Sequence, residues 1–236
     1  MPSQNLQHQM YELTSPSRAQ RVVLAAFLAA WVALSWVILF GGGLGFLSHH
    51  LLLEWNSATR LRRELLVAAF TIYFIRLLFA IFIFLRRGMA WTEVFTIAPW
   101  VGCIVLLLSI TGGFNTSSIG IACALGVALF LLGSSMNTWS EFQRHRWKQQ
   151  PQNKGQLFTR GLFRLSRHPN YFGDLISFTG LCLIAGSWIT AIIPVLMLLG
   201  FVFVNIPVLD AHLRARYGAA FDDYVKTTAR LIPFIY

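Results

Sequence analysis

The residues best suited to chemistry gather in one run, RGLFRLSRHPNYFGD, at positions 160–174 of a chain that is otherwise mostly apolar. Pro169 fixes its own φ and pushes His168 into an extended conformation, so the run predicts a turn that leads into a helix. Asn170 suits the helix N-cap, and Asp174 suits the first turn. Arginine, histidine and amide side chains in such a turn favour an anionic ligand. The alternative is a simple cap on a helix that enters a membrane.

A second polar run extends from Asn137 to Lys148. Asn137 and Glu141 are four residues apart, so they share one face if the helix continues, and His145 and Lys148 extend that face. Because arginine offers paired donors to phosphate oxygens, this stripe and the arginines that follow it favour a phosphate site. Those arginines are Arg160, Arg164 and Arg167. Alternatively, the charges serve only to orient the chain in a membrane.

Two ionisable residues lie in or beside apolar stretches. Arg76 occurs in the middle of one, with Tyr73 one helical turn before it on the same face. An ionisable side chain inside a membrane helix is costly, so Arg76 is a functional candidate; its alternative role is a structural pair with a carbonyl or carboxylate across the bundle. Glu54, beside Trp55 in a shorter apolar segment, is either a second functional residue or an interfacial carboxylate at a helix end.

The composition indicates which elements must position these residues. The chain has 236 residues, of which 56% are hydrophobic and 12% are charged, whereas soluble domains carry about 25% charged residues. We therefore expect an all-α, polytopic integral membrane helix bundle that fills residues 1–236 as a single transmembrane domain. The net charge of +10 lies mainly in the connections between apolar stretches, which argues against a nucleic-acid partner. The cysteines have no metal-ligand spacing, so no metal site is expected.

Hydropathy predicts six spans and a short seventh segment. A bilayer requires about 20 apolar residues per helix, and six stretches approach that length. They are Val22–Phe40, Leu65–Leu85, Val94–Ile110, Ile119–Met136, Leu175–Trp188 and Ala191–Leu209. The seventh segment, Leu44–Trp55, is shorter and suggests a re-entrant or partly buried half-span. If it crosses the bilayer, the N-terminus changes sides.

The distribution of lysine and arginine predicts the orientation. Most of them lie in the N-terminal arm, the connection at Arg86 and Arg87, the long loop and the C-terminal tail. Cytoplasmic connections are enriched in these residues, so the loop at residues 137–174 and the tail are expected in the cytoplasm. In a bacterial cell the bundle would lie in the inner membrane.

Four motifs resemble those of the membrane steroid 5α-reductase family and its bacterial relatives, over residues 65–236. The first is YFIR at 73–76, followed by Arg87-Gly88, and the second is Asn137 with Ser140-Glu141. The third is GLF at 161–163 with PNYFG at 169–173, where Asp174 replaces the usual glutamate. The fourth is FDDY at 221–224, with Lys226 and the closing LIPFI at 231–235.

The resemblance implies a seven-span bundle that reduces an enone on an apolar lipid, such as a Δ4-3-ketosteroid, with NADPH held by cytoplasmic loops. It implies that Tyr73 and Glu54 hydrogen-bond the substrate ketone as the catalytic pair. Neither a G-x-G-x-x-G motif nor a P-loop is present, so membrane helices and their loops must build the cofactor site. The residues expected at that site are Arg76, Arg87, Asn137, Glu141, His145, Lys148, Arg160, Arg164, Arg167, His168, Asn170, Tyr171, Asp174 and Tyr217.

A second resemblance keeps an alternative open. Arg167-His168-Pro169 followed by Tyr171 is similar to the start of the cofactor segment in isoprenylcysteine and phospholipid methyltransferases, which share the C-terminal architecture. That resemblance implies S-adenosylmethionine and a methyl transfer. Those enzymes usually carry a Glu-Glu pair after the last span, where this chain reads Val208-Leu-Asp-Ala211. The methyltransferase is therefore the second hypothesis.

Overall fold

The computed structural model describes residues 17–51 and 58–236. This part of the chain is helical, and its one β-type contact is an isolated bridge between Ser166 and Ala229. The α-helices are α2 (Arg18–Phe40), α3 (Gly43–Leu51), α4 (Arg60–Phe79), α5 (Trp91–Phe114), α6 (Ile121–Gln149), α7 (Pro169–Ala185), α8 (Ile192–Gly200), α9 (Ile206–Tyr217) and α10 (Ala219–Thr227). The predicted all-α fold is confirmed.

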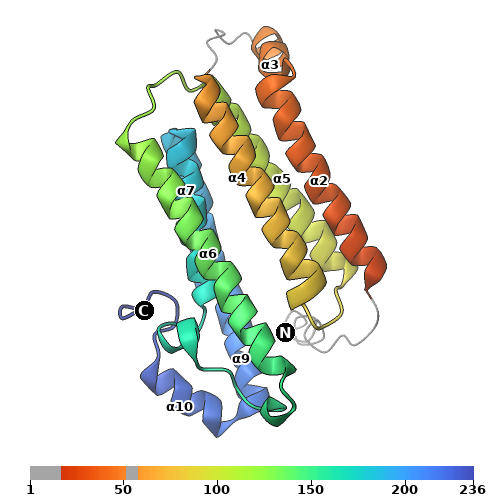
Figure 1. The fold of residues 1–236 in the computed structure, drawn as a ribbon, viewed down its shortest axis with the longest axis vertical. Helices are drawn as coiled ribbons and strands as arrows, with labels where there is room; N and C mark the ends of the chain where they lie inside the picture. Colours follow the sequence, from red (N-terminus) through yellow and green to blue (C-terminus); the bar gives the residue numbers. More distant parts are fainter. Residues whose placement is uncertain (1–16, 52–57) are drawn as a thin grey trace.

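The helices form two groups that lie side by side (Figure 1). One contains α2, α4 and α5, and the other contains α6, α7 and the helix that runs from α8 into α9. A buried apolar cluster, which includes Leu66, Leu108 and Leu181, joins the two groups. Figure 1 shows α3 at one end of the bundle and α10 with the C-terminal tail at the other.

Five segments are long and apolar enough to cross a bilayer: Arg18–Phe40, Arg60–Phe84, Trp91–Phe114, Ile121–Gln149 and Trp188–Tyr217. Helix α7, with 17 residues, is about 25 Å long at 1.5 Å per residue and falls outside that set. Helix α3, with nine residues, covers about 14 Å and is too short to cross. The chain is thus a multi-pass helical membrane protein, but the predicted count of six or seven spans is not confirmed.

The close approach of α6 and α7 positions the residues of the predicted site. Gly173 and Gly180 of α7 face the backbone of α6, and a Cβ at Gly173 would meet the carbonyl of Gly133 at 2.7 Å. Small residues let two membrane helices approach closely. The two polar runs predicted from sequence are therefore adjacent, because α6 continues unbroken to Gln149 and α7 begins at Pro169. The first part of the predicted loop is in fact the end of α6.

Two π-helical turns occur in the long spans, one at the end of its span and one in the middle. They are Ala80–Phe84, which continues α4, and Phe201–Asn205, which joins α8 to α9. Such turns are rare and occur frequently at functional sites, because each one changes the face that the following residues present. The first turn contributes Ala80 and Phe84 to the lining of the cavity described next, and the second turn precedes α9, which also lines it.

Candidate functional site

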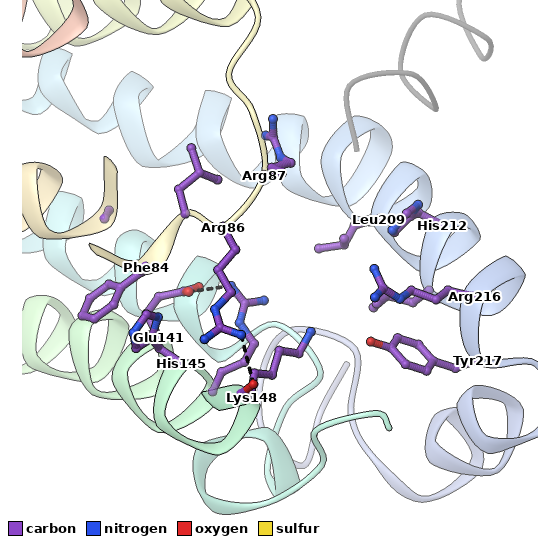
Figure 2. Close-up of a pocket in the computed structure, with 14 residues that line it drawn as sticks. Phe84, Arg86, Arg87, Glu141, His145, Lys148, Leu209, His212, Arg216 and Tyr217 are labelled. Atoms are coloured by element: carbon purple, nitrogen blue, oxygen red, sulfur yellow. Dashed lines mark hydrogen bonds and ion pairs between the residues drawn. The ribbon is translucent and has the colours of Figure 1, made fainter. Parts of the chain in front are cut away.

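A cavity of about 370 Å³ lies between the π-helical turn after α4, the last turns of α6, and α9. Figure 2 shows side chains from the two sides facing one another across it. Glu141, His145 and Lys148 come from α6, and Arg216 and Tyr217 come from α9. The spacing of three or four residues along α6 places its contributors on one face, as the sequence predicted.

Positive charge dominates this cavity. The lining cations are Arg86, Arg87, Arg144, Lys148 and Arg216. Glu141 is the one carboxylate among the lining residues, and it already pairs with Arg144 at 2.5 Å. Within residues 17–51 and 58–236, neither Lys148 nor Arg216 forms an ion pair with a carboxylate. The cavity therefore carries a surplus of positive charge that an anionic ligand would neutralise.

The connection between α4 and α5, which carries Arg86 and Arg87, is held by hydrogen bonds to α2 and to α5. Arg87 donates two hydrogen bonds to Glu93, at 2.8 and 2.6 Å. Arg21 of α2 donates to the carbonyl oxygens of Leu85 and Arg87, at 3.1 and 2.9 Å. Arg86 reaches across the cavity edge to the carbonyl oxygen of Lys148, at 2.9 Å. Arg87, although it lines the cavity, is neutralised locally, whereas within the described residues Arg86 has a carbonyl partner and no carboxylate partner.

A smaller recess of about 50 Å³ adjoins the cavity and shares Lys148 and Tyr217 with it. Arg167, His168 and Asn170 line this recess. The two predicted polar runs thus meet here. The side-chain amide of Asn170 donates to Glu141 at 3.1 Å and so joins α7 to the cavity wall.

Arg167 and His168 are held by a carboxylate rather than free for a ligand. Asp210 of α9 pairs with Arg167 at 3.1 Å and with the His168 Nε2 at 2.8 Å. His168 is 1% exposed, and this burial lowers its pKa below the usual range despite the bond to Asp210. His168 is therefore neutral at pH 7. Arg230 approaches the same carboxylate at 3.8 Å.

The Asp210 cluster, defined as Asp210, Arg167, His168 and Arg230, joins the loop before α7 to the C-terminal tail. Arg167 donates through its backbone N–H to the carbonyl oxygen of Ala229 at 2.8 Å, and through its side chain to that of Thr228 at 3.1 Å. Both arginines and the His168 ring face one carboxylate, and this arrangement joins these segments of the fold, while the Nε atoms of Arg167 and Arg230 have no hydrogen-bond partner in the described residues.

A column of polar side chains leads from the cavity into the bundle. Asn137 donates to the carbonyl oxygen of Asn170 at 2.9 Å. One turn farther along α7, Asp174 pairs with Arg76 of α4 at 2.7 Å. The guanidinium of Arg76 lies 4.7 Å from the ring centre of Tyr73, whose ring meets Phe178 edge-on at 5.2 Å. The column thus ends at Tyr73, which lies deeper in the bundle than the cavity.

Arg76 is paired across the bundle, as one of the two sequence interpretations expected. Its side chain is 7% exposed, and its Nε is buried without a hydrogen-bond partner in the described part of the chain. A buried donor without a partner is costly, and a bound water or a polar ligand group would satisfy it.

Several other predicted residues lie elsewhere. Arg160 and Arg164 are exposed and line neither the cavity nor the recess. Tyr171 lies in a stack of parallel rings, 5.5 Å from His168 and 4.5 Å from Phe201, next to the recess. Glu54 lies outside the described residues.

Sequence reasoning missed four residues of this region. From the sequence, Arg86, Arg144 and Arg216 contribute only to the orientation of the chain in the membrane, although all three line the cavity. Asp210 enters only because it lies where methyltransferases carry a Glu-Glu pair, although it holds Arg167 and His168. The position of Arg144, three residues after Glu141 on one helix face, was a usable signal. The joining of α9 to α6 and to the loop before α7 depends on tertiary contacts, and no spacing in the sequence reveals it.

The comparisons with known proteins agree with this geometry. The family model described as "Protein of unknown function (DUF1295)" matches residues 86–228, which include most of the lining of the cavity and, from the Asp210 cluster, Asp210, Arg167 and His168. The chain belongs to this family. The resemblance to steroid 5α-reductases, with a C-terminal part shared with isoprenylcysteine methyltransferases, is confirmed by relatives of both kinds.

Three relatives illustrate the two kinds. Human 3-oxo-5-alpha-steroid 4-dehydrogenase 2 is 28% identical over 48% of this chain and 42% of its own length. Protein-S-isoprenylcysteine O-methyltransferase of Schizosaccharomyces pombe is 25% identical over 52% of this chain and 50% of its own. The probable O-methyltransferase ustE of Ustilaginoidea virens is 36% identical over 40% and 34%, respectively. The matches thus span half or less of these relatives, all of which are enzymes by name.

Proposed function

We propose that this protein is an NADPH-dependent membrane reductase that reduces the carbon–carbon double bond of an enone lipid, with a Δ4-3-ketosteroid converted to its 5α-dihydro product as the leading candidate. The observation that carries the proposal is the surplus of positive charge in the cavity, where Arg86, Lys148 and Arg216 have no carboxylate partner in the described chain. The DUF1295 family match and the steroid dehydrogenase relatives support the same reaction class.

The charge of the cavity discriminates between the two cofactors that the relatives suggest. NADPH carries a pyrophosphate and a 2′-phosphate, whereas S-adenosylmethionine carries a sulfonium and has no phosphate. Arg86, Arg144, Lys148 and Arg216 are suited to phosphate oxygens. The same surplus of charge would repel a sulfonium. The residues present therefore fit NADPH better than the methyl donor.

The column from Asn170 to Tyr73 would carry the chemistry. When bound, NADPH supplies a hydride to the β-carbon of the enone, and a proton at the α-carbon completes the reduction. The Tyr73 hydroxyl would donate a hydrogen bond to the substrate carbonyl oxygen and stabilise the negative charge that develops there. The pair of Arg76 with Asp174 fixes the guanidinium over the Tyr73 ring, so this ring is positioned by α7 as well as by α4. Glu54 is proposed as the second hydrogen-bonding group to the carbonyl.

The proposal includes an orientation. The cavity, the α2 arginines Arg18 and Arg21, and the charged tail all belong to one end of the bundle. By the positive-inside rule this end faces the cytoplasm, where NADPH is available. In a bacterial cell the protein would then lie in the inner membrane.

A methyltransferase is the second candidate, favoured by the relatives named O-methyltransferases, whose matches cover 40% and 52% of this chain. Arg167 and His168, the residues that suggested it, are engaged by Asp210. This pairing reduces their availability to a methyl donor.

The decisive experiment measures ligand stabilisation of the purified protein in mild detergent. A ligand that binds only the folded state raises the apparent melting temperature as its concentration rises. We expect NADPH to stabilise more than NADH and S-adenosylmethionine to have no effect, followed by oxidation of NADPH when a Δ4-3-ketosteroid is added. Stabilisation by S-adenosylmethionine alone would overturn the reductase. Stabilisation by NADPH without turnover of any ketosteroid would retain the cofactor and reject the substrate.

A further inference from the structure

The C-terminal turn, residues 232–236, presents two large apolar side chains to the surroundings. Phe234 is 89% exposed and Ile235 is 81% exposed. Leu231, the first residue of the closing LIPFI motif, is 0% exposed. This short segment therefore has a buried residue, Leu231, and an exposed apolar tip, Phe234 and Ile235, which is unusual for a segment that faces only water.

The backbone of this turn is built to project the tip. Phe234 has a φ of +64°, and it is the one non-glycine residue in the described chain with a positive φ. A bulky side chain in the left-handed region is strained, and such strain persists only where surrounding contacts impose it. The N–H groups of Leu231 and Ile232 donate to the carbonyl oxygen of Tyr236, at 2.5 and 2.7 Å, and close the turn.

The turn is also fixed to the body of the protein. The Ser166 hydroxyl donates to the carbonyl oxygen of Leu231 at 2.8 Å, and Arg230 donates to the Tyr236 hydroxyl at 2.7 Å. Because Arg230 lies near Asp210, at 3.8 Å, the turn is continuous with the Asp210 cluster. The tip is thus part of a rigid tail.

The position of the turn indicates what covers it. In Figure 1 the C-terminal end projects sideways from the bundle, at the height of the lower ends of α2 and α4. The apolar spans end at this height, so it corresponds to the boundary between acyl chains and headgroups. An exposed cation on a neighbouring segment, Arg164, provides attraction for anionic headgroups.

We propose that the C-terminal turn is a membrane-interface anchor that inserts Phe234 and Ile235 into the leaflet at the cavity end of the bundle. The anchor holds the tail, and through Arg230 the Asp210 cluster, at a fixed depth beside the cavity. It would also give Arg164 a role in headgroup binding rather than in the cavity.

The test measures the surroundings of a nitroxide spin label at position 234. Cys103 is exposed and is replaced by alanine, while Cys123 and Cys182 are buried and remain. Phe234→Cys is labelled, and the protein is reconstituted in vesicles of phosphatidylcholine and phosphatidylglycerol. The control is Lys226→Cys on α10, whose native side chain is 73% exposed. Ile235→Cys provides an independent second variant.

Collision rates with oxygen, which concentrates in the bilayer, and with a water-soluble nickel chelate distinguish the outcomes. We expect the labels at 234 and 235 to favour oxygen and the label at 226 to favour the chelate. Equal chelate access at all three positions would place the turn in water and overturn the proposal. Exclusion of both reagents, with magnetic coupling between labels, would show a second copy on the turn and would also overturn it.

Discussion

The cavity and the Asp210 cluster use the same residue types for opposite purposes. In the Asp210 cluster one buried carboxylate meets Arg167, His168 and Arg230. In the cavity one carboxylate, Glu141, faces five lining cations and is already paired with Arg144. The two regions adjoin one another through the recess lined by Arg167, His168 and Lys148.

The comparison of the cavity with the Asp210 cluster shows that the number of cations in a region does not by itself identify a ligand site. An arginine that meets a carboxylate within the fold contributes to the structure, whereas a cavity with surplus cations is incomplete without an anion. Arg76 resembles the arginines of the Asp210 cluster, because Asp174 pairs with one end of its guanidinium while its Nε has no partner in the described structure, as is also true of the Nε atoms of Arg167 and Arg230. Four predictions test this contrast.

The largest effect on stability is expected at Asp210. Asp210→Asn leaves the buried Arg167 without its carboxylate, and breaking a buried ion pair from one side costs about 3–5 kcal/mol. We expect the free energy of unfolding, measured by denaturant titration in detergent, to fall by that amount. Asp222→Asn is the control, because Asp222 pairs with Arg214 at a site where both side chains are at least 50% exposed; such pairs contribute about 0–1 kcal/mol. Similar losses in the two variants would contradict the structural role of the cluster.

The largest effect on turnover is expected at Tyr73. Removal of its hydroxyl in Tyr73→Phe should lower the rate of ketosteroid reduction by about 10²- to 10³-fold, the usual loss for one donor to a developing oxyanion. NADPH binding should be unchanged, because the cavity cations remain. Steady-state kinetics together with NADPH titration would separate the two quantities. Unchanged turnover would remove Tyr73 from the mechanism.

Arg216 tests the cavity itself. Arg216→Gln removes a cation that has no carboxylate partner in the described chain, so we expect little loss of stability. Hydrogen bonds to charged groups contribute about 1.5–3 kcal/mol, so NADPH affinity should weaken by about 10- to 100-fold. Arg60→Gln is the control, since the Arg60 side chain is 82% exposed and pairs with Glu64 far from the cavity.

Two outcomes would count against that prediction. If Arg216→Gln destabilised the protein as Asp210→Asn does, the residue would belong to the fold rather than to a ligand site. If it left NADPH affinity unchanged, the cofactor would bind elsewhere. The affinity of the unmodified protein should also fall as salt is added, because exposed charges are screened.

The sequence predicted the parts of this molecule that depend on local spacing. The stripe from Asn137 to Lys148 lies on one helix face, because α6 continues through it. The turn signals around Pro169 located the start of α7 to within two residues, but the N-cap is His168 rather than the predicted Asn170, and Asp174 lies beyond the first turn. The assignment of phosphate-binding arginines was less successful, because Arg160 and Arg164 differ from Arg144 and Arg216 only in tertiary position. Hydropathy predicted a full membrane span at Leu175–Trp188, but α7, which contains most of that stretch, has only 17 residues and is shorter than the spans described above.

The smallest and most specific prediction concerns His168. Its burial lowers its pKa below the ordinary value of about 6.5, so the unfolded chain binds this proton more tightly than the folded protein does. Stability should therefore be fully present above about pH 6.5 and should fall as the pH decreases from there toward the lowered pKa, by at most about 1.4 kcal/mol per pH unit for one proton. His168→Gln should reduce this slope in thermal melts at different pH values, whereas the exposed His50→Gln should leave it unchanged. An identical slope in His168→Gln would show that the fold does not lower the pKa of His168, and would contradict a neutral ring in the Asp210 cluster.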